Sequence, residues 1–100
     1  MRRGNKRISK EDNLRNLDDV VPLTSLRERE TGVVVHAVGG FGLVRRLAEM
    51  GLTPGVEVKV LRTGPFRGPF EIEVRGVALA LGRGVASRVF VRPLRSESNG

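Results

Sequence analysis

The side chains that could do chemistry are few, and their spacing assembles no catalytic group. His36 is the only histidine, and the absence of cysteine removes thiolate nucleophiles, thiolate metal ligands and disulfides together. A serine nucleophile needs a base that a carboxylate orients, and neither Ser25 nor Ser87 has such partners at a recognisable spacing. Because His36 lies among valines, we expect it to be a half-buried structural residue. The sequence therefore predicts a protein that is not an enzyme.

Three glutamates are the remaining candidates for a metal site. Glu71 and Glu73 alternate along one predicted strand and so share a face, where Glu57 could join them around a hard cation. The same alternation is typical of a solvated strand that faces Lys59 or Arg75 across a sheet. With one histidine and no cysteine, the chain offers too few ligands for tight iron or zinc binding. We expect neither a metal site nor a cofactor.

Basic residues and one aromatic loop make nucleic acid a candidate partner. The formal charge is +7, but the first ten residues carry five of the eighteen lysines and arginines, and residues 23–94 hold eleven against six acids without a basic block. Arg62, Phe66, Arg67 and Phe70 surround one predicted loop, as in proteins that bind single strands. With four phenylalanines and no tyrosine or tryptophan, the stacking surface is thin. We therefore favour protein contact over nucleic acid at this loop.

The strands that position these residues follow from periodicity. Alternation of apolar and polar residues, together with β-branched runs, predicts strands over residues 33–38, 56–60, 70–75, 77–81 and 88–92. The first is rich in valine and is expected to be buried on both faces or nearly so. Arg75 and Gly76 fit a two-residue hairpin turn. Residues 63–69, rich in glycine and proline, are expected to form an exposed, twisted loop that is too long for a tight hairpin.

One helix interrupts the strands. Apolar residues recur at helical spacing over residues 43–50, with charged residues between them, which predicts a short amphipathic helix. Gly51 can take the left-handed conformation that ends such a helix, and Leu52 can supply the accompanying apolar contact. Pro54 and Gly55 then fit a type II turn.

Five short strands and one helix predict a mainly β fold, a small and partly open barrel, because curling a sheet reduces its exposed edges. We place the barrel in residues 23–94, after a basic and disordered extension over residues 1–22 and before a disordered tail over residues 95–100. No apolar stretch approaches the roughly 20 residues that span a bilayer, and the basic start is followed by no apolar signal segment. The expected location is the cytoplasm, without membrane insertion.

The order of these motifs is specific. Its most characteristic piece is the helix, cap and turn, and it continues through the later glycines and strands: Arg46-Leu47-x-x-x-Gly51-Leu52-x-Pro54-Gly55, Gly68-Pro69, Val74-Arg75-Gly76, the apolar strand over residues 77–81, and Arg83 with Ala86. Over residues 23–94 the chain resembles the FeoA family. Two features depart from that pattern: Arg29 stands where we expect a glycine before the first strand, and the basic segment before Pro22 is additional.

The resemblance implies an SH3-like barrel of about five strands that works in the cytosol beside FeoB, a membrane ferrous iron transporter with a G-protein-like domain, as its partner or regulator. It implies no catalysis. Any attachment to the inner membrane would then be peripheral and through that partner. The same barrel also occurs as the C-terminal domain of iron- and manganese-dependent repressors, where it packs on other domains and can lend ligands to metal sites.

The leading hypothesis is an adaptor that docks through the short helix and the 63–69 loop. Its predicted interface is an apolar patch inside a rim of arginines, namely Phe41, Leu52 and Phe66 within Arg45, Arg62 and Arg67. Two alternatives stay open. One is a small basic barrel that binds nucleic acid, and the other is a metal-responsive module that recruits Glu57, Glu71 or Glu73.

Overall fold

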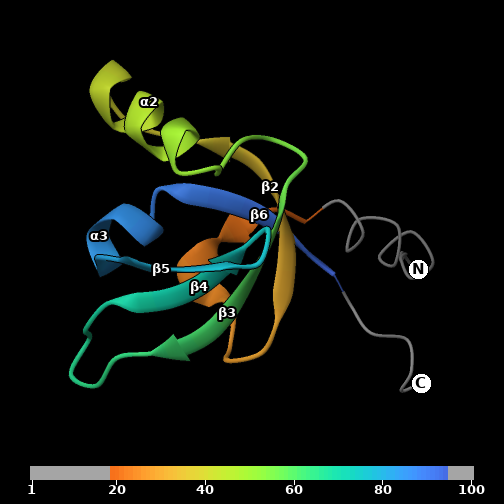
Figure 1. Cartoon of the computed structure of the whole chain (residues 1–100), viewed down its shortest axis with the longest axis vertical. Helices are drawn as coiled ribbons and strands as arrows, with labels where there is room; N and C mark the ends of the chain where they lie inside the picture. The colour runs from red at the N-terminus through yellow and green to blue at the C-terminus, as the bar shows by residue number, and fades with distance from the viewer. Residues whose placement is uncertain (1–18, 95–100) are drawn as a thin grey trace, which may run out of the picture.

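Six antiparallel strands lie in the order β1-β6-β2-β3-β4-β5 in the computed structural model, which describes residues 19–94 (Figure 1). The elements follow one another as β1 (Val21–Pro22), the 3-10 helix η1 (Leu23–Ser25), β2 (Thr31–Ala37), α2 (Phe41–Glu49), β3 (Glu57–Thr63), β4 (Phe70–Val74), β5 (Val77–Leu81), α3 (Arg83–Ala86) and β6 (Val89–Leu94). The mainly β fold is confirmed.

The sheet curls into a barrel that stays open, because its two outer strands, β1 and β5, pair with only one neighbour each. Two irregularities help the sheet to bend. The register shifts between Val34 and His36 where β2 pairs with β6, and between Val60 and Arg62 where β3 pairs with β4. Such bulges increase the local twist and bend the strand that carries them.

The core lies inside the curled sheet and consists of the apolar members of each alternating strand. On β4 the buried residues Phe70, Ile72 and Val74 alternate with half-buried glutamates. The predicted alternation of β3 and β4 is therefore confirmed. β2 was predicted to be buried on both faces or nearly so; one face is buried, and the other is half-buried at Thr31, Val33 and Val35. His36 lies on the other face, is exposed, and stacks on the ring of Phe90 at 5.2 Å between centroids, so the prediction that it is half-buried is wrong.

The end of α2 has the predicted cap. Gly51 has a φ of 97°, its N–H donates to the Ala48 carbonyl at 2.9 Å, and the N–H of Leu52 donates to the Leu47 carbonyl at 2.9 Å. These two bonds make a Schellman motif, which satisfies carbonyls that the helix leaves free. Leu52 and Leu47 are both buried, at 3% and 1% exposed, and anchor this end of the helix in the core. The helix begins two residues before its predicted start, at Phe41.

Positive φ angles mark the tight turns. Gly55 has a φ of 92°, and the Val56 N–H donates to the Thr53 carbonyl at 3.1 Å, as in the predicted type II turn. Arg75 and Gly76, with φ angles of 53° and 82°, form the predicted two-residue turn between β4 and β5.

Arg29, which departs from the family pattern, also has a positive φ, at 75°. This is a conformation that glycine adopts without strain. A glycine is therefore expected here for a physical reason. In this chain Arg29 lies in a turn, in which the Glu30 N–H donates a hydrogen bond to the Arg27 carbonyl at 3.0 Å.

Other boundaries differ from the prediction. Val21–Pro22 pairs with β6 as β1, so the sheet begins two residues before the predicted barrel. The segment between β5 and β6, for which no element was predicted, contains the short helix α3. Residues 1–18 and 95–100, where we predicted disorder, lie outside the described part of the chain. Within residues 19–94, no helix is long and apolar enough to cross a membrane.

Candidate protein-docking surface

The tip of the β3–β4 hairpin carries the most exposed large apolar side chain of the described residues. Phe66 is 98% exposed. Residues 64–69 lie outside both strands, as expected of a loop, but their backbone closes in a tight turn, so the prediction that this segment is too long for a tight hairpin is wrong. The Gly64 N–H donates to the Pro69 carbonyl at 2.8 Å, and the Gly68 N–H donates to the Pro65 carbonyl at 2.9 Å.

The two central residues of this turn have unusual backbone angles. Phe66 and Arg67 have φ angles of 55° and 61°, as a type I′ turn requires at both central positions. That turn favours Asn-Gly, and a residue with a side chain costs roughly 1–2 kcal/mol in the left-handed conformation. The chain therefore holds a bulky aromatic residue at a position that disfavours it and that buries none of it. Such strain is concentrated at functional sites in folded proteins.

Glycines on both sides of the turn allow its backbone to approach closely, and prolines restrict it. A Cβ atom at Gly64 would lie 3.1 Å from Pro69, and one at Gly68 would lie 3.0 Å from the Pro65 carbonyl oxygen. The prolines fix their own φ angles. Phe66 is thus presented on a stiff support, which reduces the entropy lost when a partner binds it.

Arginines surround this tip, as the sequence predicts. Arg62 makes an ion pair with Glu71 on the neighbouring strand, at 3.3 Å. Arg67 lies beside a hollow of about 450 Å³, which it lines together with Arg83 and the hydroxyl residues Thr24 and Ser87. No acidic residue lines this hollow among the described part of the chain. The Arg83 guanidinium is held in place 4.8 Å above the centre of the Phe70 ring.

The predicted helix surface lies elsewhere. Phe41, the first residue of α2, is 81% exposed, and Arg45 on the same helix pairs with Glu49 at 3.5 Å. Figure 1 shows α2 and the tip of the β3–β4 hairpin at opposite ends of the molecule. The structure therefore does not bring Phe41 and Phe66 into one patch, and the predicted single interface divides into two separate surfaces.

Leu52 does not belong to either surface. Its side chain is 3% exposed, because the Schellman motif turns it into the core beside the end of α2. The prediction that Leu52 takes part in docking is wrong, and the cap role predicted for the same residue accounts for its burial.

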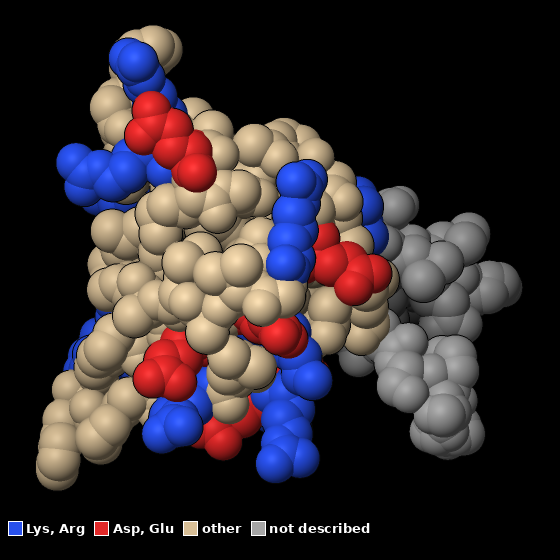
Figure 2. All heavy atoms as spheres, viewed as in Figure 1, with Lys and Arg blue, Asp and Glu red and all other residues tan. Residues whose placement is uncertain are grey.

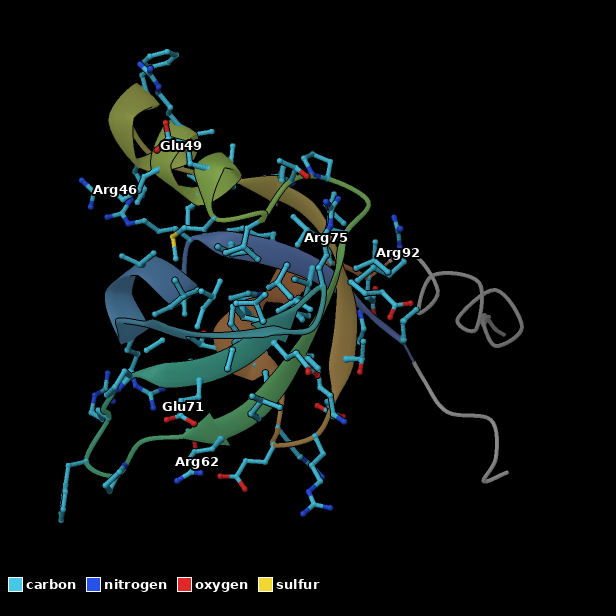
Figure 3. All side chains as sticks on the ribbon, in the orientation of Figure 1. Arg46, Glu49, Arg62, Glu71, Arg75 and Arg92 are labelled. Atoms are coloured by element: carbon cyan, nitrogen blue, oxygen red, sulfur yellow. The ribbon has the colours of Figure 1, made fainter. Side chains whose placement is uncertain are left out.

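Two of the three glutamates of the metal alternative, Glu57 and Glu73, line one hollow of about 490 Å³ together with Lys59 and Arg75. The third, Glu71, pairs with Arg62 instead. Figure 2 shows basic and acidic side chains interspersed around this face, and Figure 3 shows Arg62 and Glu71 directed toward each other. Glu73 lies opposite Lys59 in the β3–β4 register. No group of three or more His, Cys, Asp or Glu residues that could hold a metal ion occurs within residues 19–94.

Sequence reasoning missed the tight turn of this hairpin, although a signal was present. Gly64-Pro65-Phe66 is repeated as Gly68-Pro69-Phe70, which places a Gly-Pro pair symmetrically on each side of the two turn residues. The repeat could have indicated two strands approaching a short turn. Phe and Arg at the centre concealed it, because neither residue is typical of a type I′ turn.

Comparison with known proteins adds a family to this geometry. Residues 21–93 match the FeoA domain family. The chain is 36% identical over 70 residues to the protein named "Putative Fe(2+) transport protein A" from Methanocaldococcus jannaschii, a match that covers 70% of this chain and 83% of that protein.

Solved structures agree with this family. The chain is similar to the crystal structure of an iron uptake regulatory protein, FeoA, with 45% identity, a TM-score of 0.71, and coverage of 76% of this chain and all of that one. It is also similar in fold to a manganese-dependent transcriptional repressor, with 22% identity, a TM-score of 0.69, and coverage of 75% of this chain and 42% of the repressor. The barrel is thus of the SH3-like kind.

Proposed function

The chain belongs to the FeoA domain family, and we propose that it is a non-enzymatic accessory of ferrous iron transport that docks on the cytosolic part of a FeoB-type transporter. The relative from Methanocaldococcus jannaschii carries a name that refers to Fe(2+) transport, which supports the transport role. Docking in the cytoplasm, without insertion into the membrane, is the part of the proposal that concerns this chain's own surface.

The observation that carries the proposal is Phe66. A large aromatic side chain that is 98% exposed contributes nothing to the core, and its left-handed backbone lowers the stability of the turn. Aromatic residues with arginines nearby are the side chains that dominate binding energy at protein interfaces. A role in contacting another protein explains why such a residue is tolerated at this position.

The arginines around Phe66 favour a partner surface with carboxylates. Arg67 is exposed at the turn, and Arg83 lies beside the same hollow. Arginine binds carboxylates through two parallel hydrogen bonds, which fixes orientation as well as adding energy. We therefore expect the partner to present an apolar pocket for Phe66 with acidic residues at its rim.

Uptake of radiolabelled Fe(2+) tests the proposal in cells whose own copy of the gene has been deleted. Cells that receive the wild-type chain should recover uptake, and cells that receive Phe66→Ala should recover little of it. Because Phe66 is exposed, the variant should accumulate to the wild-type level, which an immunoblot checks. Equal uptake with Phe66→Ala and the wild type would contradict the docking role of this turn, and uptake independent of the gene would contradict the transport role.

A further inference from the structure

The outer strand β5 is an edge without the usual protection. Natural sheets protect their edges with lysine, proline, bulges or very short strands. The opposite edge, β1, has two residues and contains Pro22. β5 has the sequence VALAL, pairs with β4 over its whole length without a register shift, and carries no charge.

The free side of β5 presents unpaired backbone groups. A two-residue turn closes with a hydrogen-bonded pair, here Val74 and Val77, and bonded and non-bonded pairs then alternate along an antiparallel ladder. The backbone groups of Val77, Leu79 and Leu81 thus face β4, and the N–H and C=O groups of Ala78 and Ala80 face outward. Among residues 19–94, no turn, loop or cap makes a backbone hydrogen bond with β5.

Apolar side chains beside this edge are also uncovered. Val77, Leu79 and Leu81 share the core-facing side of β5 with the buried residues of β4. Val77, at the start of the strand, is 56% exposed, and Leu81, at its end, is 4% exposed. Figure 1 shows β5 crossing the front of the molecule, and Figure 2 shows a broad surface without charged side chains across the middle of the same face. An added strand would cover Val77 and Leu79.

Positive charge flanks the edge at both ends. Arg75, at the β4–β5 turn, is exposed before the strand, where Figure 3 shows it (labelled). Arg83 follows the strand and lines the hollow at its other end with Arg67. The acids nearest to β5 lie on the next strands of the sheet. Glu71 on β4 is paired with Arg62, and Glu73 on β4 and Glu57 on β3 line one hollow with Lys59 and Arg75. An added strand would be roughly 10 Å from β4 and farther from β3, so Arg75 and Arg83, which directly flank β5, are the charged residues closest to its ends.

These charges decide against a second copy of the chain as the occupant. In an antiparallel pairing of two β5 strands centred on Leu79, Arg75 of each copy lies near Arg83 of the other. In a parallel pairing each arginine lies near its own counterpart. Both arrangements bring like charges together at each end, which destabilises cross-strand pairs, and the chain's net charge of +7 adds to the repulsion.

We propose that β5 is a strand-addition site for an extended segment of another protein, one that is apolar at alternate positions and has Asp or Glu at both ends. Backbone groups of Ala78 and Ala80 supply the hydrogen bonds, and Arg75 and Arg83 select the flanking acids. This surface adjoins the Phe66 turn, with which it shares the hollow lined by Arg67 and Arg83, but it uses the backbone edge of β5 and goes beyond the proposed function.

The probe is a synthetic peptide with a core as long as β5, made of alternating valine and threonine, and with two acidic residues added at each end of that core; it is added to the full chain. Amide hydrogen exchange by NMR reads the geometry. We expect the peptide to protect the amides of Ala78 and Ala80 and to leave those of Val77 and Leu79 nearly unchanged. The same peptide with lysines at its ends, or with a central proline, should bind at least several-fold more weakly.

Two variants sharpen the test. Ala80→Pro removes an outward donor while keeping every bond to β4, and should weaken peptide binding by roughly tenfold with a melting temperature close to the parent's. Arg75→Glu should lower affinity for the acidic peptide and raise it for the lysine peptide. Phe66→Ala should leave peptide binding unchanged, which separates this site from the docking turn.

The proposal is overturned if the acidic peptide does not bind, if Ala80→Pro binds it as the parent does, or if the two peptides bind equally. Protection of the Ala78 and Ala80 amides before any peptide is added would mean that the edge is already taken by the chain itself or by a second copy. Sedimentation would tell those two occupants apart, and either would overturn the proposal.

Discussion

The cap of α2 allows a stability prediction in which one chemical change has opposite effects at two nearby positions. Gly51→Ala places a side chain on a residue with a φ of 97°, whereas Gly42→Ala places one inside α2. A Cβ atom at Gly42 would meet nothing within 4 Å, and one at Gly51 would meet only a Val74 methyl group at 3.4 Å, an ordinary contact. Steric contact therefore does not distinguish the stabilities of the two variants, whereas the backbone conformation at each position does.

The left-handed conformation costs a residue with a side chain roughly 1–2 kcal/mol. Replacing glycine also restricts the unfolded chain, which returns about 0.4–1 kcal/mol. We expect Gly51→Ala to destabilise the protein by about 1 kcal/mol, and Gly51→Val by more, because β-branched residues tolerate positive φ least. Gly42→Ala should stabilise it by roughly 0.5–1 kcal/mol, since alanine is the better helix former.

Urea unfolding and thermal melting of the parent and the variants measure these effects. For a domain of this size, 1 kcal/mol corresponds to roughly 4–8 °C in melting temperature. Gly51→Ala should therefore melt below the parent and Gly42→Ala above it. If Gly51→Ala melts with the parent, the cap contributes nothing and the reasoning about α2 is refuted. A loss of stability in Gly42→Ala would show that α2 does not begin where the structure places it.

Three further changes have defined outcomes. Arg29→Gly should raise the free energy of unfolding by about 0.5–1 kcal/mol in a urea titration, because glycine adopts a φ of 75° without strain and keeps the N–H that donates to the Val60 carbonyl. A decrease would mean that the arginine side chain stabilises the turn. Leu52→Ala should lower the free energy of unfolding by roughly 2–5 kcal/mol, because Leu52 is buried in the core. An unchanged melting curve would mean that Leu52 is not a core residue and could contact a partner. The double variant Phe66→Asn, Arg67→Gly should raise the free energy of unfolding by about 1 kcal/mol, because Asn-Gly suits a type I′ turn, and it should abolish docking. A double variant that is stabilised and still docks would show that binding does not depend on Phe66 in this turn.

Much of the fold follows from local patterns in the sequence. Alternating apolar residues in β3 and β4 lie on the buried face because a strand directs successive side chains to opposite sides. The cap at Gly51 and the turn at Gly55 were predictable because few residues other than glycine adopt their backbone angles.

The failures have physical causes. At the hairpin tip, Phe66 and Arg67 adopt positive φ angles that their side chains disfavour, so no local rule predicts the tight turn. On β2 the valine run suggested burial on both faces or nearly so, but the outer face is only half-buried at its valines, and His36 on that face is exposed. Only the complete arrangement of strands decides such coverage.

The candidate site was predicted in its parts and not in its arrangement. The sequence identifies Phe66 and its arginines, because an aromatic residue among prolines, glycines and arginines suits an exposed loop. It cannot show that Phe41 lies at the other end of the molecule, since that depends on where α2 packs. Leu52 was predicted both to pack at the cap of α2 and to contact a partner, and its burial is consistent only with the first role.

Calorimetric titration of the transporter's cytosolic domain with this chain tests the central claim most directly, with duplex and single-stranded nucleic acid as the competing ligands. The account predicts binding to the transporter domain that persists between low and moderate salt, is lost in Phe66→Ala, and largely survives deletion of the first ten residues. Nucleic-acid binding would instead weaken steeply with salt, with a smaller slope after that deletion. Submicromolar binding to nucleic acid at physiological salt, without binding to the transporter domain, would contradict the account.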